Sequence, residues 1–188
     1  MPTRSIRALL ILLFLCSFGG LSIFSGRIFA APTTFTVNSS ADSSDVVPGD
    51  DICQTATPGE CTLRASLEEA NADADTDTIE FDITSAEGAG PHTILPSSAL
   101  PTLVNPVVID ATTEPGFVAN TAQSPNPFNG TMMIVLSGTN VVSVSNGLTF
   151  DTGSNNSSVK GLVINNWKYD GISIANASNL TIRGNLYR

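Results

Sequence analysis

The sequence predicts an all-β fold, a solenoid of stacked parallel β coils that begins with a region containing one short α-helix. Short apolar alternations recur in the second half with a period of 23 to 25 residues. Turns rich in Gly, Asn and Ser separate them, which leaves no room for a helix in each repeat. The one convincing helical pattern lies earlier, over residues 62–72.

The first residues indicate export. A short basic flank precedes an apolar run from Ala8 to Phe24, and small residues follow at Ala30 and Ala31. This order is typical of a secretory signal peptide. A permanent anchor is the alternative, but Ser and Gly interrupt the run, which is near the lower limit for a span. We expect a signal peptide over residues 1–31, a secreted or cell-surface location and no membrane span after cleavage.

The mature chain is strongly acidic, with five basic residues left against all 17 acids. Nucleic acid and anionic surfaces are therefore unsuitable partners, because either would need a basic patch. An acidic exterior leaves calcium and neutral glycans open, and it can also be no more than a solvated surface.

Cys53 and Cys61 are the two cysteines that follow the leader. An even number of cysteines in an exported protein predicts a disulfide, which in so short a loop would stabilise the fold by about 2.5 kcal/mol. A metal site is the weaker alternative, because His92 is the only histidine and is remote in sequence.

The region before the repeats contains two strands, a loop and a helix. Residues 33–39 and 78–83 alternate with a period of two and predict strands. The helix follows Thr62, a suitable N-cap, with Arg64, Glu68 and Glu69 expected to face outward. The intervening loop contains four carboxylates that are weak calcium candidates, although they lack the spacing of an EF-hand. These are Asp42, Asp45, Asp50 and Asp51.

The repeats predict specific contacts between successive coils. Offsets of 23 and 24 place Val159 beside Ile182, Leu148 beside Ile172 and Phe150 beside Ile174 as inward stacks. The same register predicts an amide ladder of Asn156 with Asn179, and it places Lys160 beside Arg183, which hints at a cationic site. Looser matches with an offset of 25 relate Ile109 to Ile134 and Ile134 to Val159.

Two stretches resemble a known family. Cys61-Thr-Leu-Arg-Ala-Ser66 resembles the motif Cys-Ser-Leu-Arg-Glu-Ala of the CSLREA domain, matching it at Cys61, Leu63 and Arg64. Residues 108–116 and 159–166 are similar to bacterial surface proteins with right-handed parallel β-helix repeats of the pectate-lyase type. The resemblance implies a right-handed, single-stranded parallel β-helix whose N-terminal end is covered by the disulfide and the helix. It implies a cap over residues 32–105 and repeats over residues 106–188.

Two functional hypotheses from different classes remain. In the first, the protein is a non-catalytic adhesion or glycan-binding module that recognises an extracellular polysaccharide or a surface partner. Exposed aromatic and amide side chains in one turn suggest the binding patch, although Trp167 could simply fill a hydrophobic gap. The candidate residues are Asn165, Asn166, Trp167, Tyr169 and Asp170.

In the second hypothesis the chain is a fragment of a polysaccharide lyase or glycoside hydrolase. Such enzymes need a base beside calcium-binding carboxylates, or two carboxylates across the glycosidic bond. The repeats contain Asp151 and Asp170, which do not align into an acidic row, so we assign no catalytic residue. The chain ends about one coil after its last repeat, and we expect further sequence beyond Arg188.

Overall fold

Parallel β-strands make up most of the regular structure. The computed structural model describes residues 31–188, so the predicted signal peptide falls almost entirely outside the described residues. Two α-helices, two 3-10 turns and eleven strands follow one another in the order β1 Thr34–Val37, α1 Leu63–Ala70, β2 Asp77–Phe81, α2 Thr84–Glu87, β3 His92–Ile94, β4 Val107–Asp110, η1 Ala111–Thr113, β5 Ile134–Ser137, η2 Gly138–Asn140, β6 Leu148–Phe150, β7 Ser158–Lys160, β8 Leu162–Asn165, β9 Ile172–Ile174, β10 Thr181–Arg183 and β11 Leu186–Tyr187.

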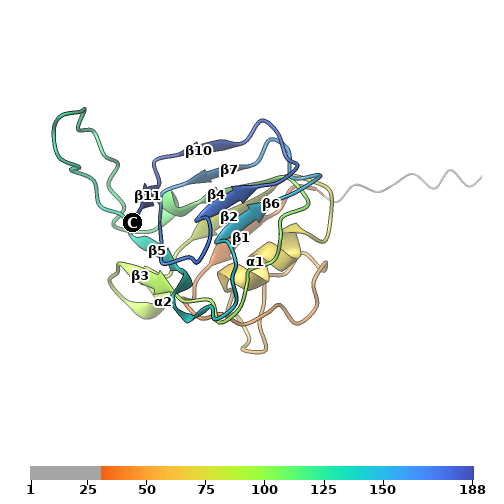
Figure 1. Ribbon diagram of the computed structural model, residues 1–188. Helices are drawn as coiled ribbons and strands as arrows, with labels where there is room; N and C mark the ends of the chain where they lie inside the picture. The colour runs from red at the N-terminus through yellow and green to blue at the C-terminus, as the bar shows by residue number, and fades with distance from the viewer. Residues whose placement is uncertain (1–30) are drawn as a thin grey trace, which may run out of the picture.

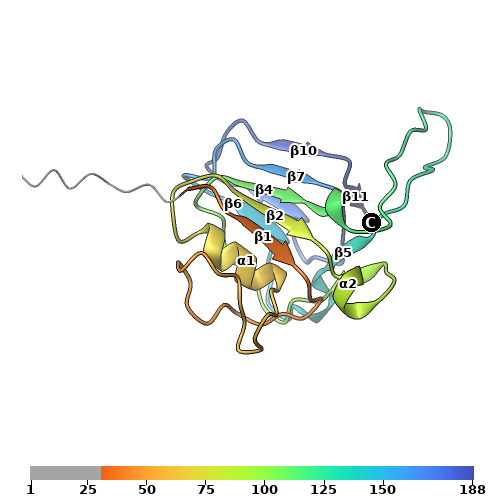
Figure 2. The same cartoon turned by 180° about the vertical axis from the view of Figure 1, so that it is seen from behind.

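The strands form three sheets, and neighbours within a sheet are far apart in sequence (Figures 1 and 2). One sheet has the order β1-β2-β4-β7-β10, a second has the order β11-β8-β5-β3, and β6 pairs with β9. Every strand pair is parallel. The predicted boundary between residues 105 and 106 falls between β3 and β4, and β2 pairs directly with β4 across it.

The predicted register of the three side-chain stacks is confirmed, but Ile174 in β9, which was expected to lie inward, has an exposed fraction of 48%. Ile182 pairs with Val159, Ile172 with Leu148 and Ile174 with Phe150. In the five-stranded sheet the first of these stacks continues through Ile109 to Ile79, and these two side chains and Val159 are fully buried. Aliphatic side chains one strand spacing apart therefore form the core of the protein.

The looser matches with an offset of 25 are wrong. Ile109 pairs with Val159, 50 residues further along, and Ile134 lies in the other sheet opposite Leu162. The reason is the long chain segment between β4 and β7, which contains two strands and a projecting loop over residues 114–131 (Figure 1). The 50 residues that separate Ile109 from Val159 are about twice the length of the repeat, so a fixed period fails there.

The predicted amide ladder is also confirmed. The Asn179 side-chain nitrogen donates to Asn156 Oδ1 at 3.4 Å, 23 residues away. Both asparagines have positive φ angles, 64° and 59°, a conformation that asparagine tolerates better than other side chains do. The two residues therefore occupy equivalent positions, each two residues before a strand, β7 or β10.

Helix α1 begins and packs as predicted, but two of its charged side chains are buried instead of exposed. Thr62 Oγ1 accepts a hydrogen bond from the Ala65 N–H as the N-cap, and the helix lies beside β1 (Figures 1 and 2). The expectation that Arg64 and Glu69 face outward is wrong, because both are buried, with exposed fractions of 8% and 2%.

Loops cover the outer face of α1, which explains the burial of these two charged side chains. Arg64 forms an ion pair with Asp42 at 2.9 Å and donates to the carbonyl oxygens of Ser98 and Ala99. Glu69 accepts hydrogen bonds from two backbone N–H groups of the loop, those of Gly49 and Asp51. Buried charged groups need such partners, so both side chains fasten the loops to the helix.

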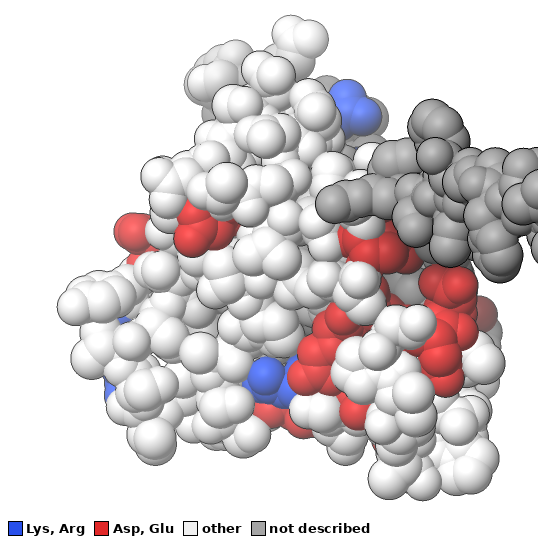
Figure 3. All heavy atoms as spheres, turned by 90° about the vertical axis from the view of Figure 1, so that its right-hand side faces the viewer, with Lys and Arg blue, Asp and Glu red and all other residues white. Residues whose placement is uncertain are grey.

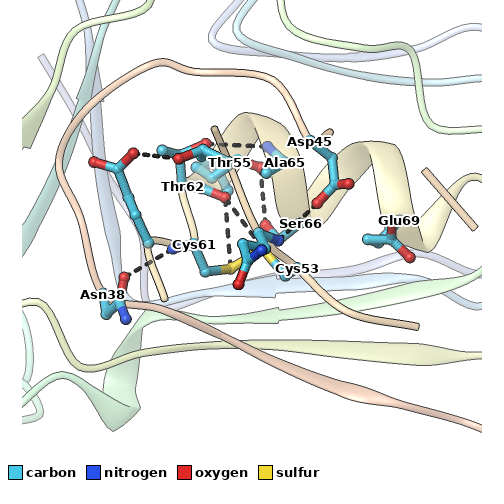
Figure 4. The surroundings of a disulfide bond; sticks show 12 residues. Asn38, Asp45, Cys53, Thr55, Cys61, Thr62, Ala65, Ser66 and Glu69 are labelled. Carbon is cyan, nitrogen blue, oxygen red and sulfur yellow. Dashed lines mark hydrogen bonds between the residues drawn. A yellow bond between two sulfur atoms is a disulfide. The ribbon is translucent and has the colours of Figure 1, made fainter. Parts of the chain in front are cut away.

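The predicted disulfide between Cys53 and Cys61 is present (Figure 4). The Cys61 carbonyl accepts hydrogen bonds from the Asn38 and Ser39 N–H groups, directly after β1, at 3.0 and 3.2 Å. The disulfide therefore holds a segment that occupies part of the outer edge of the sheet, where unpaired strand groups would otherwise invite aggregation.

No helix within residues 31–188 is long and apolar enough to cross a membrane.

Carboxylates are concentrated in the first half of the described chain. Thirteen of the 17 acidic residues lie between Asp42 and Glu87, and many gather on one face (Figure 3). Burial, reinforced by neighbouring carboxylates, raises the pKa of Glu69 to about 7 and that of Asp77 to about 6. The ionised forms of these two groups therefore oppose folding at neutral pH.

The protein should become more stable as the pH falls from 8 to 5. A carboxyl whose pKa is raised in the folded state binds its proton more tightly there than in the unfolded chain. Protonation of this carboxyl therefore stabilises the fold fully below the unfolded-state pKa, and the stabilisation is lost as the pH rises through the folded-state pKa. For Glu69 and Asp77 this window extends from about pH 4 to about pH 7. Thermal midpoints measured across this range should therefore be higher at the acidic end.

Asp77→Asn should raise the thermal midpoint at pH 8 by several degrees and weaken the pH dependence of that midpoint. Asp170→Asn, which removes an exposed carboxylate, serves as the control. A midpoint that is lower at pH 5 than at pH 8 in the unmodified protein would contradict the assignment.

Candidate functional site

Four of the five residues predicted to bind a glycan surround one pocket. This pocket, called here the aromatic pocket, has a volume of about 290 Å³. Its lining is Ile164, Asn165, Asn166, Trp167, Tyr169, Gly171, Tyr187 and Arg188. The fifth predicted residue, Asp170, is not part of the lining, and its backbone groups form hydrogen bonds with Asn146 and Gly147, which precede β6.

Trp167 forms a fixed wall of the pocket. Its ring is half-buried, packs against the core, and donates from Nε1 to the Leu136 carbonyl at 3.4 Å. A Cβ atom at Gly138 would lie 2.7 Å from the ring, and one at Gly147 would lie 3.0 Å from it. Glycine at these two positions therefore gives the indole room to lie close to the backbone, so Trp167 both fills a gap and lines the pocket.

Two tyrosines supply the exposed aromatic surface. The exposed fractions of Tyr169 and Tyr187 are 67% and 51%. The ring of Tyr187 lies near Gly171, where an added Cβ would contact it at 3.4 Å. Partial burial raises the pKa of Tyr187 above its ordinary value. A tyrosine hydroxyl is neutral at physiological pH and can donate a hydrogen bond.

Sequence reasoning missed Tyr187 and Arg188, although the repeat contained the signal that places them. Tyr187 of β11 pairs with Ile164 of β8, an offset of 23. The Arg188 N–H also donates to the Ile164 carbonyl, at 3.2 Å. Extending the predicted register from β10 into β11 would have placed Tyr187 and Arg188 at the aromatic pocket.

Two asparagine amides provide polar groups at the pocket. The Asn166 side-chain nitrogen donates to Ser137 Oγ and to Asn165 Oδ1, both at 3.1 Å. Among the described residues, the Asn165 amide nitrogen donates to no protein group and remains available to a ligand. Tyrosine faces with fixed amides suit a sugar ring, because the C–H face of a sugar stacks on an aromatic ring while its hydroxyls pair with amides.

The four weak calcium candidates hold the loop together through protein contacts. The Asp42 carboxylate accepts from Arg64 and Ser97, that of Asp45 from Val47 and Gln54, and that of Asp50 from Ile52. Asp51 contributes its N–H to Glu69. Within residues 31–188, no three His, Cys, Asp or Glu side chains are grouped to hold a metal ion. Calcium dependence stays a prediction.

Comparisons with known protein families, with curated proteins and with solved structures found no match.

Gly138→Ala should disturb the aromatic pocket. The added methyl would lie 2.7 Å from the Trp167 ring and 2.8 Å from the Asn166 carbonyl oxygen, so the ring must move outward at a cost of about 1–3 kcal/mol. Because Trp167 is the only tryptophan, its fluorescence emission should shift to the red and the thermal midpoint should fall. Gly88→Ala serves as a control for the emission, because its added methyl has no atom within 4 Å and should leave the fluorescence of Trp167 unchanged, although the positive φ at Gly88 adds a backbone cost that Gly138 does not have. An unchanged emission maximum in Gly138→Ala would contradict the described packing.

Proposed function

We propose that this protein is an exported, non-catalytic β-helix protein that binds a glycan at the aromatic pocket. The observation that carries this proposal is the convergence of two exposed tyrosines with asparagine amides around one pocket. The pocket volume of about 290 Å³ lies near the lower end of the range for small-molecule sites. It suits one sugar unit of a chain better than a large compact ligand.

The parallel pairing supports the architectural part of the proposal. Strands pair in register at offsets of 23 for β7 with β10 and for β8 with β11, and of 24 for β6 with β9. We infer a right-handed coil that passes once through each of the three sheets, with α1 and the disulfide segment as a cap at β1. The resemblance of this segment to CSLREA domains and of the coils to surface β-helix proteins agrees with this arrangement.

Two features support export. The leader pattern of residues 1–31 is that of a signal peptide. The disulfide between Cys53 and Cys61 is typical of proteins outside reducing compartments. A secreted or cell-surface location would bring the pocket into contact with extracellular polysaccharide.

The lining groups favour binding over bond cleavage. Glycoside hydrolysis depends on two carboxylates that flank the scissile bond. The residues that line the aromatic pocket provide phenol, amide, indole and guanidinium groups. These groups can orient and hold a sugar, so we prefer the binding module to the fragment of a lyase or hydrolase.

Titration with a panel of soluble oligosaccharides tests the proposal. At least one glycan should change the fluorescence of Trp167, and Tyr169→Ala should weaken that binding by about five-fold or more, because an aromatic contact contributes about 1 kcal/mol. Val144→Ala, a truncation of another exposed side chain outside the pocket, should leave the affinity unchanged. Failure of every glycan to bind, or equal binding by Tyr169→Ala, would overturn the proposal.

A further inference from the structure

Asp77, the first residue of β2, is a buried carboxylate with an incomplete set of partners. Its exposed fraction is 0%. Oδ1 accepts a hydrogen bond from the Thr33 N–H at 2.8 Å, whereas Oδ2 is enclosed and has no partner within the described residues. A buried charged oxygen without a partner destabilises the fold, so a further donor at this place, above all a cation, would stabilise it.

Three other carboxylates lie near Asp77. Asp73 and Asp75 precede β2, and Asp51 comes from the loop that covers α1. Burial raises the pKa of Asp77 to about 6, and the charges of these three neighbours add to the effect. Oδ2 of Asp75 is also enclosed and without a partner among the described residues. The four residues Asp51, Asp73, Asp75 and Asp77 are called here the aspartate cluster.

No basic side chain within residues 31–188 forms an ion pair with the aspartate cluster. Arg64 pairs with Asp42, and Lys160 pairs with Asp110. The other three basic residues of this part of the chain follow residue 167, in the last turns and strands. A cation that balances the aspartate cluster therefore has to come from another group of the protein.

The segment that contacts Asp77 is the start of the mature chain. Cleavage of the leader after Ala30 or Ala31 leaves a free α-amino group on residue 31 or 32. Its ordinary pKa is about 8, so it is positively charged at neutral pH. Thr33 follows at most two residues later, which spans no more than about 7 Å. Thr33 Oγ1 also donates to the Ala31 carbonyl at 3.2 Å, which keeps the segment turned beside Asp77.

We propose that removal of the leader creates an α-ammonium group that binds the aspartate cluster and fastens the start of β1 to β2. This inference rests on the proposed export and is independent of the glycan site. In a chain that continues before residue 31 the cluster lacks this cation, and the ion pair forms only after processing. Export and the final stability of the fold are thereby coupled.

The test compares two forms of the chain that begins at Ala31, one with a free amine and one with an Nα-acetyl group, which removes the charge. At pH 7 the free-amine form should unfold about 3 °C or more above the acetylated form. Asp77→Asn should abolish this difference, because it removes the partner of the ammonium. Asp170→Asn, which removes an exposed carboxylate outside the cluster, should leave the difference unchanged.

Asp77→Asn should also act differently in the two forms. In the acetylated form, as in a chain that continues before residue 31, the substitution removes an unbalanced buried carboxylate and raises the midpoint. In the free-amine form this gain should be smaller, because the substitution also removes the ion pair. This comparison stays informative even where one form is less stable overall, since each substitution is judged against its own parent.

The difference between the two forms should depend on pH. Pairing raises the pKa of the ammonium in the folded state, so its contribution is complete below the ordinary pKa near 8 and is lost as the pH rises through the folded value. The midpoints of the two forms should therefore converge by about pH 10. The pKa of the α-amino group, measured by nuclear magnetic resonance, should be higher in the free-amine form than in its Asp77→Asn variant.

Three outcomes would overturn the proposal. The first is equal midpoints of the free and acetylated forms at pH 7. The second is a difference that persists in Asp77→Asn. The third is a secreted protein that still carries residues before position 31 by mass spectrometry. Glycan affinity at the aromatic pocket should be the same in both forms, so failure of the ammonium site would leave the glycan proposal intact, and the converse also holds.

Discussion

The in-register parallel stacking of inward aliphatic side chains is the constraint on which the rest of this structure depends. Ile79, Ile109, Val159 and Ile182 occupy one position in neighbouring strands of the five-stranded sheet. Because side chains alternate between the two faces of a strand, a slip of one residue would turn each of these apolar groups toward solvent. Burial therefore fixes the register, and the register decides which exposed residues become neighbours.

The aromatic pocket is a consequence of that register. Residues of β8 and its following turn meet residues of β11 only because these strands pair at an offset of 23, which brings Tyr187 beside Ile164. Two glycines earlier in the chain, Gly138 and Gly147, leave space for the Trp167 ring. The pocket thus combines residues from segments far apart in the sequence, and its geometry depends on the strand register beneath it.

The sequence was sufficient where a feature repeats or is local. The strands, the helix start at Thr62 and the stack of Val159 with Ile182 follow from periodicity and capping. It failed where chain segments distant in sequence decide the environment. The loops that bury Arg64 come from far along the chain, and the long insertion after β4 displaces Ile109 from the expected period. Four residues of the site were predicted from one turn, whereas the space that Gly138 and Gly147 leave for the Trp167 ring could be found only in the three-dimensional arrangement.

The measurement that tests the central claim most directly is nuclear Overhauser contact between inward methyl groups in methyl-labelled protein. The described register predicts contacts of Val159 with both Ile109 and Ile182, because these residues occupy adjacent strands. It predicts that Ile109 and Ile134 are not paired on neighbouring strands, since they lie in different sheets. Pairing of Ile109 with Ile134 and of Ile134 with Val159 would contradict the register, and with it the origin of the aromatic pocket.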